Sequence, residues 1–241
     1  MNHSILALRR GAAANAVAVL VSAAAMAAAT QAHALAASSY DLINGDNSSL
    51  GTSLRDDSYA GGTGNKTVPY AALAGGLGDL TDGAVAPSNW NITPGPFVGW
   101  RDAYLPSPTI SFHFGQDVDL AEVRVHINKG YSPGSVDLTM GGTTRHFAVD
   151  MDVSGAANDW VSFAGLALSG DTLVLRLNDR APEIVNGIFL SRDWILISEV
   201  TFDGKVSAVP ESSTHALLLV GLLGLGAGQR RRAWRGRAAV R

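Results

Sequence analysis

The chain from Pro108 onward alternates apolar and polar residues with a period of two. Ile110, Phe112 and Phe114 share one face of an extended segment, and the segment 122–128 alternates in the same way. Comparable patterns occupy 135–140, 144–149, 160–163, 172–177 and 194–202. Turn residues separate these segments at short intervals, and between the two ends of the chain no long segment has a helical period. The pattern predicts an all-β domain, an antiparallel β-sandwich of the jelly-roll kind.

The region 35–105 differs, because it is rich in Gly, Ser, Asn and Asp and has few sustained apolar runs. The stretches 44–47 and 61–65 carry the residues that favour turns. We therefore expect this part of the domain to consist mainly of loops.

The N-terminal end carries Arg9 and Arg10, then an apolar run from Ala12 to about Ala29, then Ala32-His33-Ala34. A basic segment, an apolar segment and a small-x-small site in this order are typical of a secretory signal peptide. We place cleavage after Ala34, so that residues 1–34 are the signal peptide. The alternative is an N-terminal membrane anchor, which the alanine-rich composition disfavours because alanine contributes little hydrophobic driving force.

The C-terminal end has three parts in sequence: Val209-Pro210-Glu211 with the polar residues that follow, an apolar run over 216–228, and the arginines 230–232. An apolar run partitions into a bilayer, and arginines hold its end on the cytoplasmic side. The run is shorter than the roughly 20 residues that span a hydrocarbon core, although counting from Ser212 to Gln229 comes close. The alternative, a core helix of a soluble domain, fits its four glycines poorly.

This tail resembles the PEP-CTERM sorting signal of Gram-negative bacteria, with Ser212 where a second proline is usual. The resemblance implies that an exosortase, a membrane protease-transpeptidase, reads the motif at Val209, Pro210 and Glu211. It also implies that the C-terminal helix holds the protein briefly in the inner membrane before it reaches the cell surface or the medium. The predicted organisation is therefore a signal peptide (1–34), one domain (35–207) and a sorting signal (208–241).

Charge changes the picture once these ends are set aside. The whole chain has 18 basic and 21 acidic residues, but the span 35–209 keeps ten basic and twenty acidic ones, a net charge of −10. An acidic domain is poorly suited to nucleic acid, because nothing neutralises the phosphates. The chain has no cysteine, so stability must come from a core or from bound ions rather than from disulfides.

Five segments of the domain resemble, in the same order, those of the galactose-binding-like, discoidin-type jelly rolls. They are the Asp-Gly segment at 80–83 with Trp90 after it, and the strands at 108–115, 118–125, 171–177 and 197–204. The resemblance covers roughly 77–204 and implies the jelly-roll fold.

The same resemblance implies a structural Ca²⁺ where the Asp-Gly loop meets the last strand. Asp82 and Glu199 would supply carboxylates, and Asp79 with nearby backbone carbonyls would complete the oxygen ligands. The alternative is that Asp82-Gly83 is a plain turn, with the Asp side chain capping its own backbone.

A carbohydrate site usually needs an aromatic platform with polar groups beside it. The segment Trp100, Arg101, Asp102 and Tyr104 offers aromatic rings, a hydrogen-bond donor and an acceptor close together, although such aromatic residues also serve as core. The chain has no nucleophile-elbow, zinc-protease or phosphate-loop motif. We therefore expect a non-catalytic, exported module that binds carbohydrate or exopolysaccharide, and as the alternative a structural, calcium-stabilised biofilm matrix protein without a sugar ligand.

Overall fold

The computed structural model describes residues 33–207 except for 49–50, 151–156, 181–182, 186–187 and 191–192. The chain divides into two compact units, Met1–Val206 and Ser207–Arg241. The predicted sorting motif, the C-terminal helix and nearly all of the signal peptide lie outside the described residues. Within those residues, no helix has the length and apolar character needed to cross a membrane.

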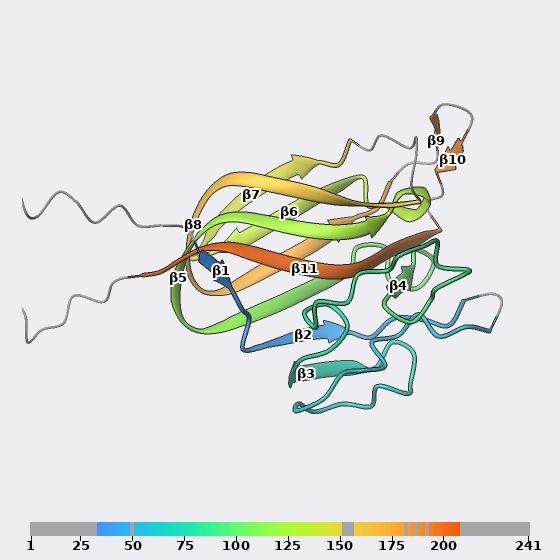
Figure 1. Cartoon of the computed structure of the whole chain (residues 1–241), viewed down its shortest axis with the longest axis horizontal. Coiled ribbons are helices and arrows are strands. Elements are labelled where there is room, and N and C mark those ends of the chain that lie inside the picture. Colours follow the sequence, from blue (N-terminus) through green and yellow to red (C-terminus); the bar gives the residue numbers. More distant parts are fainter. Residues whose placement is uncertain are drawn as a thin grey trace, which may run out of the picture. The chain divides into compact units, whose positions relative to one another are not determined.

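The regular secondary structure in the described part of the chain consists almost entirely of antiparallel strands, which confirms the predicted all-β class (Figure 1). A single turn of 3-10 helix, η2 (Lys129–Tyr131), joins two of them. The strands are β1 (His33–Leu35), β2 (Ser39–Ile43), β3 (Ala72–Gly76), β4 (Val98–Arg101), β5 (Thr109–Asn128), β6 (Ser135–Met140), β7 (Thr143–Ala148), β8 (Asn158–Asn178), β9 (Glu183–Val185), β10 (Ile188–Leu190) and β11 (Trp194–Val206).

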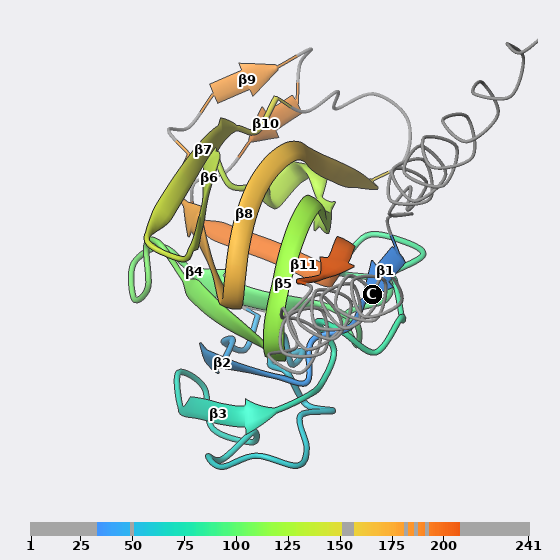
Figure 2. The ribbon, with the colours of Figure 1, turned by 90° about the vertical axis from the view of Figure 1, so that its left-hand side faces the viewer.

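The two longest strands, β5 and β8, form one ribbon that takes part in both layers of the sandwich. They have 20 and 21 residues and pair from Thr109–Arg176 to Asn128–Asn158. The pairing shifts register between His113 and Val118 and again at Ala121, where the ribbon curves over. Figure 2 shows the two strands side by side as they curve. Such irregularities bend a ladder without ending it.

The remaining strands add to the two halves of this ribbon. β2 pairs with the part of β5 that precedes the bend, and β6 pairs with the segment of β8 that lies opposite this part. β3 then pairs with β2, and β7 pairs with β6. β11 pairs with the other half of β5 and is flanked by β4 and β1. The halves face each other, because the Phe202 ring of β11 lies 5.0 Å from Phe112 and 5.2 Å from Phe114 of β5.

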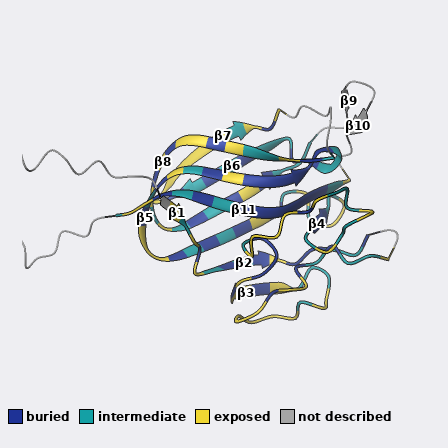
Figure 3. Cartoon of the chain, in the orientation of Figure 1, coloured by how far each residue is buried: buried dark blue, intermediate teal, exposed yellow. Residues whose placement is uncertain are grey.

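The predicted alternation in β5 is confirmed by burial. Ile110, Phe112 and Phe114 are buried before the bend, and Val123 and Val125 after it, while most of their neighbours are at least partly exposed. Figure 3 shows the same banding along β5 and β6, whereas β11 is buried continuously from Ile195 to Val200. Each side chain buried in this way contributes roughly 1.5–3 kcal/mol, so this two-residue period accounts for most of the sandwich core.

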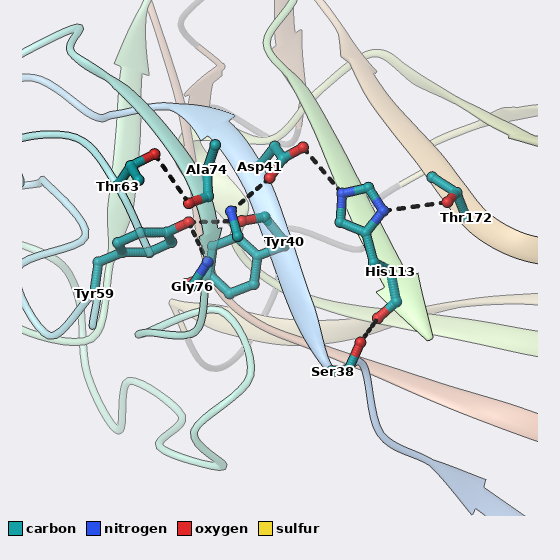
Figure 4. A network of polar contacts seen from close by, with 10 residues as sticks. Ser38, Tyr40, Asp41, Tyr59, Thr63, Ala74, Gly76, His113 and Thr172 are labelled. Atoms are coloured by element: carbon teal, nitrogen blue, oxygen red, sulfur yellow. Dashed lines mark hydrogen bonds and ion pairs between the residues drawn. The ribbon is translucent and has the colours of Figure 1, made fainter. Parts of the chain in front are cut away.

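The region 35–105 consists mainly of loops, as expected, but it also contains the strands β2, β3 and β4, which the sequence pattern does not indicate. β2 is a true layer strand whose Tyr40 and Leu42 point into the core. Figure 4 shows the polar contacts that fix it: the Tyr59 hydroxyl donates to the Tyr40 carbonyl at 2.7 Å, and His113 lies between Asp41 and Thr172. These strands are short and isolated along the chain, so their pattern does not stand out.

The loop segments 44–48 and 51–56 lie directly on the edge of β4. The backbone N–H of Asp46 donates to the Gly99 carbonyl at 2.8 Å, and the Gly99 N–H donates to the Leu54 carbonyl at 2.8 Å. The loop thereby covers Leu196 on the outer face of β11. A second, smaller core forms there from Leu54, Ala86, Phe97 and Leu196.

This close approach requires a glycine at position 45, so replacing Gly45 with alanine should destabilise the domain. A Cβ at Gly45 would lie 2.0 Å from the Leu54 carbonyl oxygen and 2.8 Å from that of Gly99. We expect Gly45→Ala to lower the free energy of unfolding by about 1–3 kcal/mol, measured by urea denaturation.

The matched control is Gly95→Ala in the neighbouring loop, where an added Cβ meets nothing within 4 Å. It should change the free energy of unfolding by no more than about 0.5 kcal/mol. Equal stability of the two variants would contradict the backbone packing described here.

Candidate functional site

The loop 78–86 is attached to β11 by three consecutive residues of that strand. The Val200 N–H donates to the Leu80 carbonyl at 2.8 Å, and the Gly83 N–H donates to the Glu199 carboxylate at 3.1 Å. The Ala86 N–H lies 3.4 Å from the Ser198 hydroxyl oxygen. The Asp-Gly loop and the last strand therefore meet.

Buried carboxylates gather beside this junction. Asp56 is fully buried and accepts the Tyr40 hydroxyl and, at 3.0 Å, the Asp79 N–H. Burial raises the pKa of Asp56. Asp79 is 5% exposed, and burial, assisted by the charges of Asp56, Asp57 and Asp82, raises its pKa to about 7.

Glu199 is the third buried acid, with 3% of its surface exposed. Burial raises its pKa to about 7, the Asp82 charge adds to the rise, and the hydrogen bond from Gly83 opposes it. A carboxylate in this position costs free energy to ionise, because neighbouring protein replaces its water. Asp79 and Glu199, whose pKa values are both raised to about 7, therefore change their charge near neutral pH.

The geometry of these side chains supports a Ca²⁺ site only in part. In favour, the buried Oδ2 atom of Asp79 has no hydrogen-bond partner. Against it, Asp82 is exposed and its Oδ1 accepts the Ala84 N–H at 2.8 Å, as in a turn. The described residues hold no group of three or more His, Asp or Glu side chains placed for a metal ion. A Ca²⁺ ion there would need backbone carbonyls for most of its six to eight oxygens, and calcium stays a prediction.

A second polar and aromatic cluster lies around Arg101, at the end of β4. Its guanidinium carbon lies 4.8 Å from the centre of the Trp194 ring and 5.7 Å from that of Tyr104. Arg101 and Trp194 are directly opposite each other in the β4–β11 pairing, so their side chains share a face. Tyr104 is 65% exposed.

Two more residues complete this cluster. The Arg101 Nε lies 3.8 Å from the Asp46 carboxylate, which also accepts the Tyr70 hydroxyl at 2.9 Å. The Tyr70 ring lies 5.5 Å from that of Tyr104. Tyr70 has a φ of 58°, an uncommon conformation for a residue with a side chain, and such positions concentrate at functional sites. We call Arg101, Trp194, Tyr104, Tyr70 and Asp46 the Arg101 surface.

The structure places the four predicted ligand residues differently from one another. Arg101 and Tyr104 lie in the surface, whereas Trp100 points the other way, is 1% exposed and donates its indole N–H to the Ile43 carbonyl at 2.6 Å. Trp100 is thus a core residue, because neighbours in a strand face opposite sides. Asp102 is half-buried, and its N–H donates to the Asp193 carbonyl at 3.0 Å. Sequence reasoning missed Asp46, Tyr70 and Trp194, which are distant in the chain.

The buried acids predict how stability depends on pH in the absence of metal. Folding raises the pKa of Glu199 from its ordinary 4.5 to about 7, so the folded chain holds a proton that the unfolded chain releases. The free energy of unfolding should therefore fall as pH rises from about 4.5 to 7. Glu199→Gln, which keeps an acceptor for Gly83, should flatten this fall in thermal melts recorded in EDTA, whereas the exposed Asp171→Asn should not. An unchanged slope in Glu199→Gln would contradict the assignment.

Added Ca²⁺ tests the metal in the same melts. An ion bound by these carboxylates favours their ionised form, so millimolar Ca²⁺ should raise Tm more at pH 8 than at pH 5. Glu199→Gln and Asp82→Asn should lose the rise. A wild-type Tm that is the same with EDTA and with Ca²⁺ would rule out the site.

Comparison with known proteins gives this fold a family. The profile of the family described as "Discoidin domain-containing receptor 1/2, DS-like domain" matches residues 37–204. A Caenorhabditis elegans protein, discoidin domain-containing receptor tyrosine kinase B, is 27% identical over 178 residues, which are 69% of this chain and 21% of that relative. The chain thus spans about a fifth of the relative's length.

Solved structures of low sequence identity also align with the chain. The C-terminal domain of a chitobiase from Bacteroides fragilis aligns with a TM-score of 0.41 at 12% identity, covering 73% of this chain and 100% of that one. A Streptococcus pneumoniae fucose binding module aligns with a TM-score of 0.36 at 13% identity, covering 53% and 81%. Because the family profile matches well over half of the sequence, the chain belongs to the family of DS-like domains of discoidin domain-containing receptors 1 and 2.

Proposed function

We propose that this protein is an exported, non-catalytic module that binds carbohydrate, such as an exopolysaccharide, at the Arg101 surface. One observation supports this most directly: the Arg101 guanidinium lies against two aromatic rings, one of them largely exposed, with a carboxylate at its side. Fixed polar groups bordered by aromatic faces are what a sugar requires, because its ring has apolar faces and a rim of hydroxyls.

Each part of the surface has a separate task in this proposal. The exposed ring of Tyr104 receives the apolar face of a sugar, and Arg101 donates hydrogen bonds to hydroxyl oxygens. Asp46 accepts from sugar hydroxyls. Its carboxylate already takes the Tyr70 hydroxyl and faces Arg101, which suits a fixed acceptor better than a catalytic acid.

The alternative is a structural biofilm matrix protein, stabilised by calcium and without a sugar ligand. The buried acids at Asp79 and Glu199 favour it, because a metal ion is one way to compensate such charges. This protein would keep its calcium response when the Arg101 surface is removed and would bind no polysaccharide before or after the change.

Substitutions in the Arg101 surface separate these functions. Arg101→Ala and Tyr104→Ala should each weaken binding to exopolysaccharide from the producing cell at least about tenfold in affinity electrophoresis, since residues central to a site dominate its affinity. The control is Arg124→Ala, which removes an arginine that stacks at the same 4.8 Å on Trp160 of the outer sheet face. Equal retardation of all variants would contradict the Arg101 surface, and no retardation of the wild type would favour the structural protein.

We further propose that the sorting signal directs the chain through an exosortase-like membrane protease. The order of motif, apolar run and arginine cluster supports this, and membership in a domain family found in receptors supports a location outside the cytoplasm. Residues 208–241 would be removed or exchanged after export, and the domain would then be attached at the cell surface or released.

Processing is tested on the full chain in its own cell. Glu211→Ala should leave the C-terminal segment in place, so that mass spectrometry detects residues beyond 211 and the protein remains in the membrane fraction. Ser213→Ala, two residues further on, should be processed as wild type. A wild-type protein that keeps its C-terminal segment would contradict the sorting proposal.

A further inference from the structure

Beside the Arg101 surface lies a small cavity between three aromatic side chains. Its volume is about 50 Å³, and it is lined by Trp90, Tyr131, Trp194, Leu54, Leu196 and Ser48. The three aromatic residues are half-buried, whereas Leu54 and Leu196 are buried and belong to the second core. The cavity therefore extends from the surface to that core.

The aromatic rings are held in place by polar contacts behind them. Asn128, at the end of β5, donates to the Asn89 side chain at 3.1 Å and accepts the Gly130 N–H at 3.2 Å. One side chain thus links the residue before Trp90 to the turn that carries Tyr131. The rings of Trp90 and Tyr131 meet edge to face, with their centres 6.0 Å apart and their planes at 80°. A site with such preformed walls loses little entropy when a ligand enters.

Trp194 connects the cavity with the Arg101 surface. Its ring carries the Arg101 guanidinium at 4.8 Å and also forms one wall of the cavity. A sugar bound on the Arg101 surface would therefore have a substituent next to the cavity.

The volume and the lining of the cavity indicate which substituent of the sugar would fill it. A cavity needs about 10–15 Å³ for one water-sized group, so about 50 Å³ holds roughly four such groups. An acetamido group has four heavy atoms. Its methyl group suits aromatic and leucine walls. Its carbonyl needs a donor, and the lining residues Trp90 and Trp194 each carry an indole N–H that can donate.

We infer that this cavity takes the acetamido group of an N-acetylated hexosamine within a polysaccharide bound at the Arg101 surface. The inference rests on the proposed function and adds the class of sugar to it. Discrimination comes from filling the cavity: a sugar with a hydroxyl in place of the acetamido group leaves the aromatic walls uncovered.

A quaternary ammonium group is the competing occupant, because three aromatic rings often surround such cations. The charges disfavour it here. Among the residues that the structure describes, no charged side chain lines the cavity, and the Arg101 guanidinium already lies against the Trp194 ring. A neutral acetamido group avoids the repulsion that a second cation would meet.

The test compares methyl glycosides of N-acetylglucosamine and N-acetylgalactosamine with those of glucose and galactose, by NMR titration of the full exported domain. We expect an N-acetylated glycoside to bind at least about tenfold more tightly than its parent, with saturation transfer strongest at the acetyl methyl. Trp90→Leu should abolish this preference, and the matched control Trp160→Ala, on the outer sheet face, should retain it. Melting curves of both variants show whether they are folded, and transfer to the acetyl methyl in the wild type tests the cavity without any variant.

The outcomes separate the two proposals. Equal binding of N-acetylated and parent glycosides, lost in Arg101→Ala, would overturn the acetamido cavity and leave the proposed function standing. Preference for N-acetylated glycosides that survives Arg101→Ala would support the cavity and contradict the Arg101 surface. Binding of choline instead of any glycoside, or of none of these probes at millimolar concentration, would overturn the inference.

Discussion

The continuous pairing of β5 with β8 is the constraint on which the rest of the domain depends. Each strand has to keep its hydrogen bonds while it passes from one layer to the other. The strand pairing is therefore irregular at a few positions, such as Gly115 and Gly165, whose φ values of 70° and 67° suit glycine. Every other strand of the two layers takes its register directly or indirectly from this ribbon, so the bend also fixes which loops meet at the opposite end, where Asn128 pairs with Asn158.

The Arg101 surface depends on the register between β4 and β11 and on a glycine in β4, which has no side chain. Trp194 and Arg101 are paired across β4 and β11, and two residues further on Leu196 is paired with Gly99. A Cβ at Gly99 would lie 2.2 Å from a methyl group of Leu196, so the glycine gives Leu196 room beneath the covering loop. The same loop brings Asp46 to Arg101. The packing of this loop against Gly99 thus forms the second core and places the Asp46 carboxylate beside the Arg101 guanidinium.

The sequence predicts the parts of this fold that depend on local periodicity. β6 lies at the predicted 135–140, and the residues predicted to face inward in β5 are buried. The same reasoning predicts two strands where the structure has the single strand β5. The cause is Gly115-Gln116-Asp117, which has the polarity of a loop but is the exposed bend of this strand. At the candidate site, Trp100 shows what the sequence cannot predict: the composition of the segment identifies an aromatic residue but not the face of the strand on which it lies. Asp46 and Tyr70 are joined to Arg101 by contacts between distant segments, which no local pattern contains.

The buried acids and the aromatic cavity are two ends of one anchored segment. Glu199 and its neighbours in β11 hold the beginning of this segment, and the Asn158 side chain donates to the carbonyls of Ala86 at 2.9 Å and Ser88 at 2.6 Å. Trp90 lies two residues after Ser88. Because buried backbone carbonyls need partners, Asn158 fixes the path of the loop up to the wall of the cavity. The hydrogen bond from the Gly83 N–H to Glu199 therefore attaches the beginning of the same loop whose other end Asn158 fixes next to Trp90.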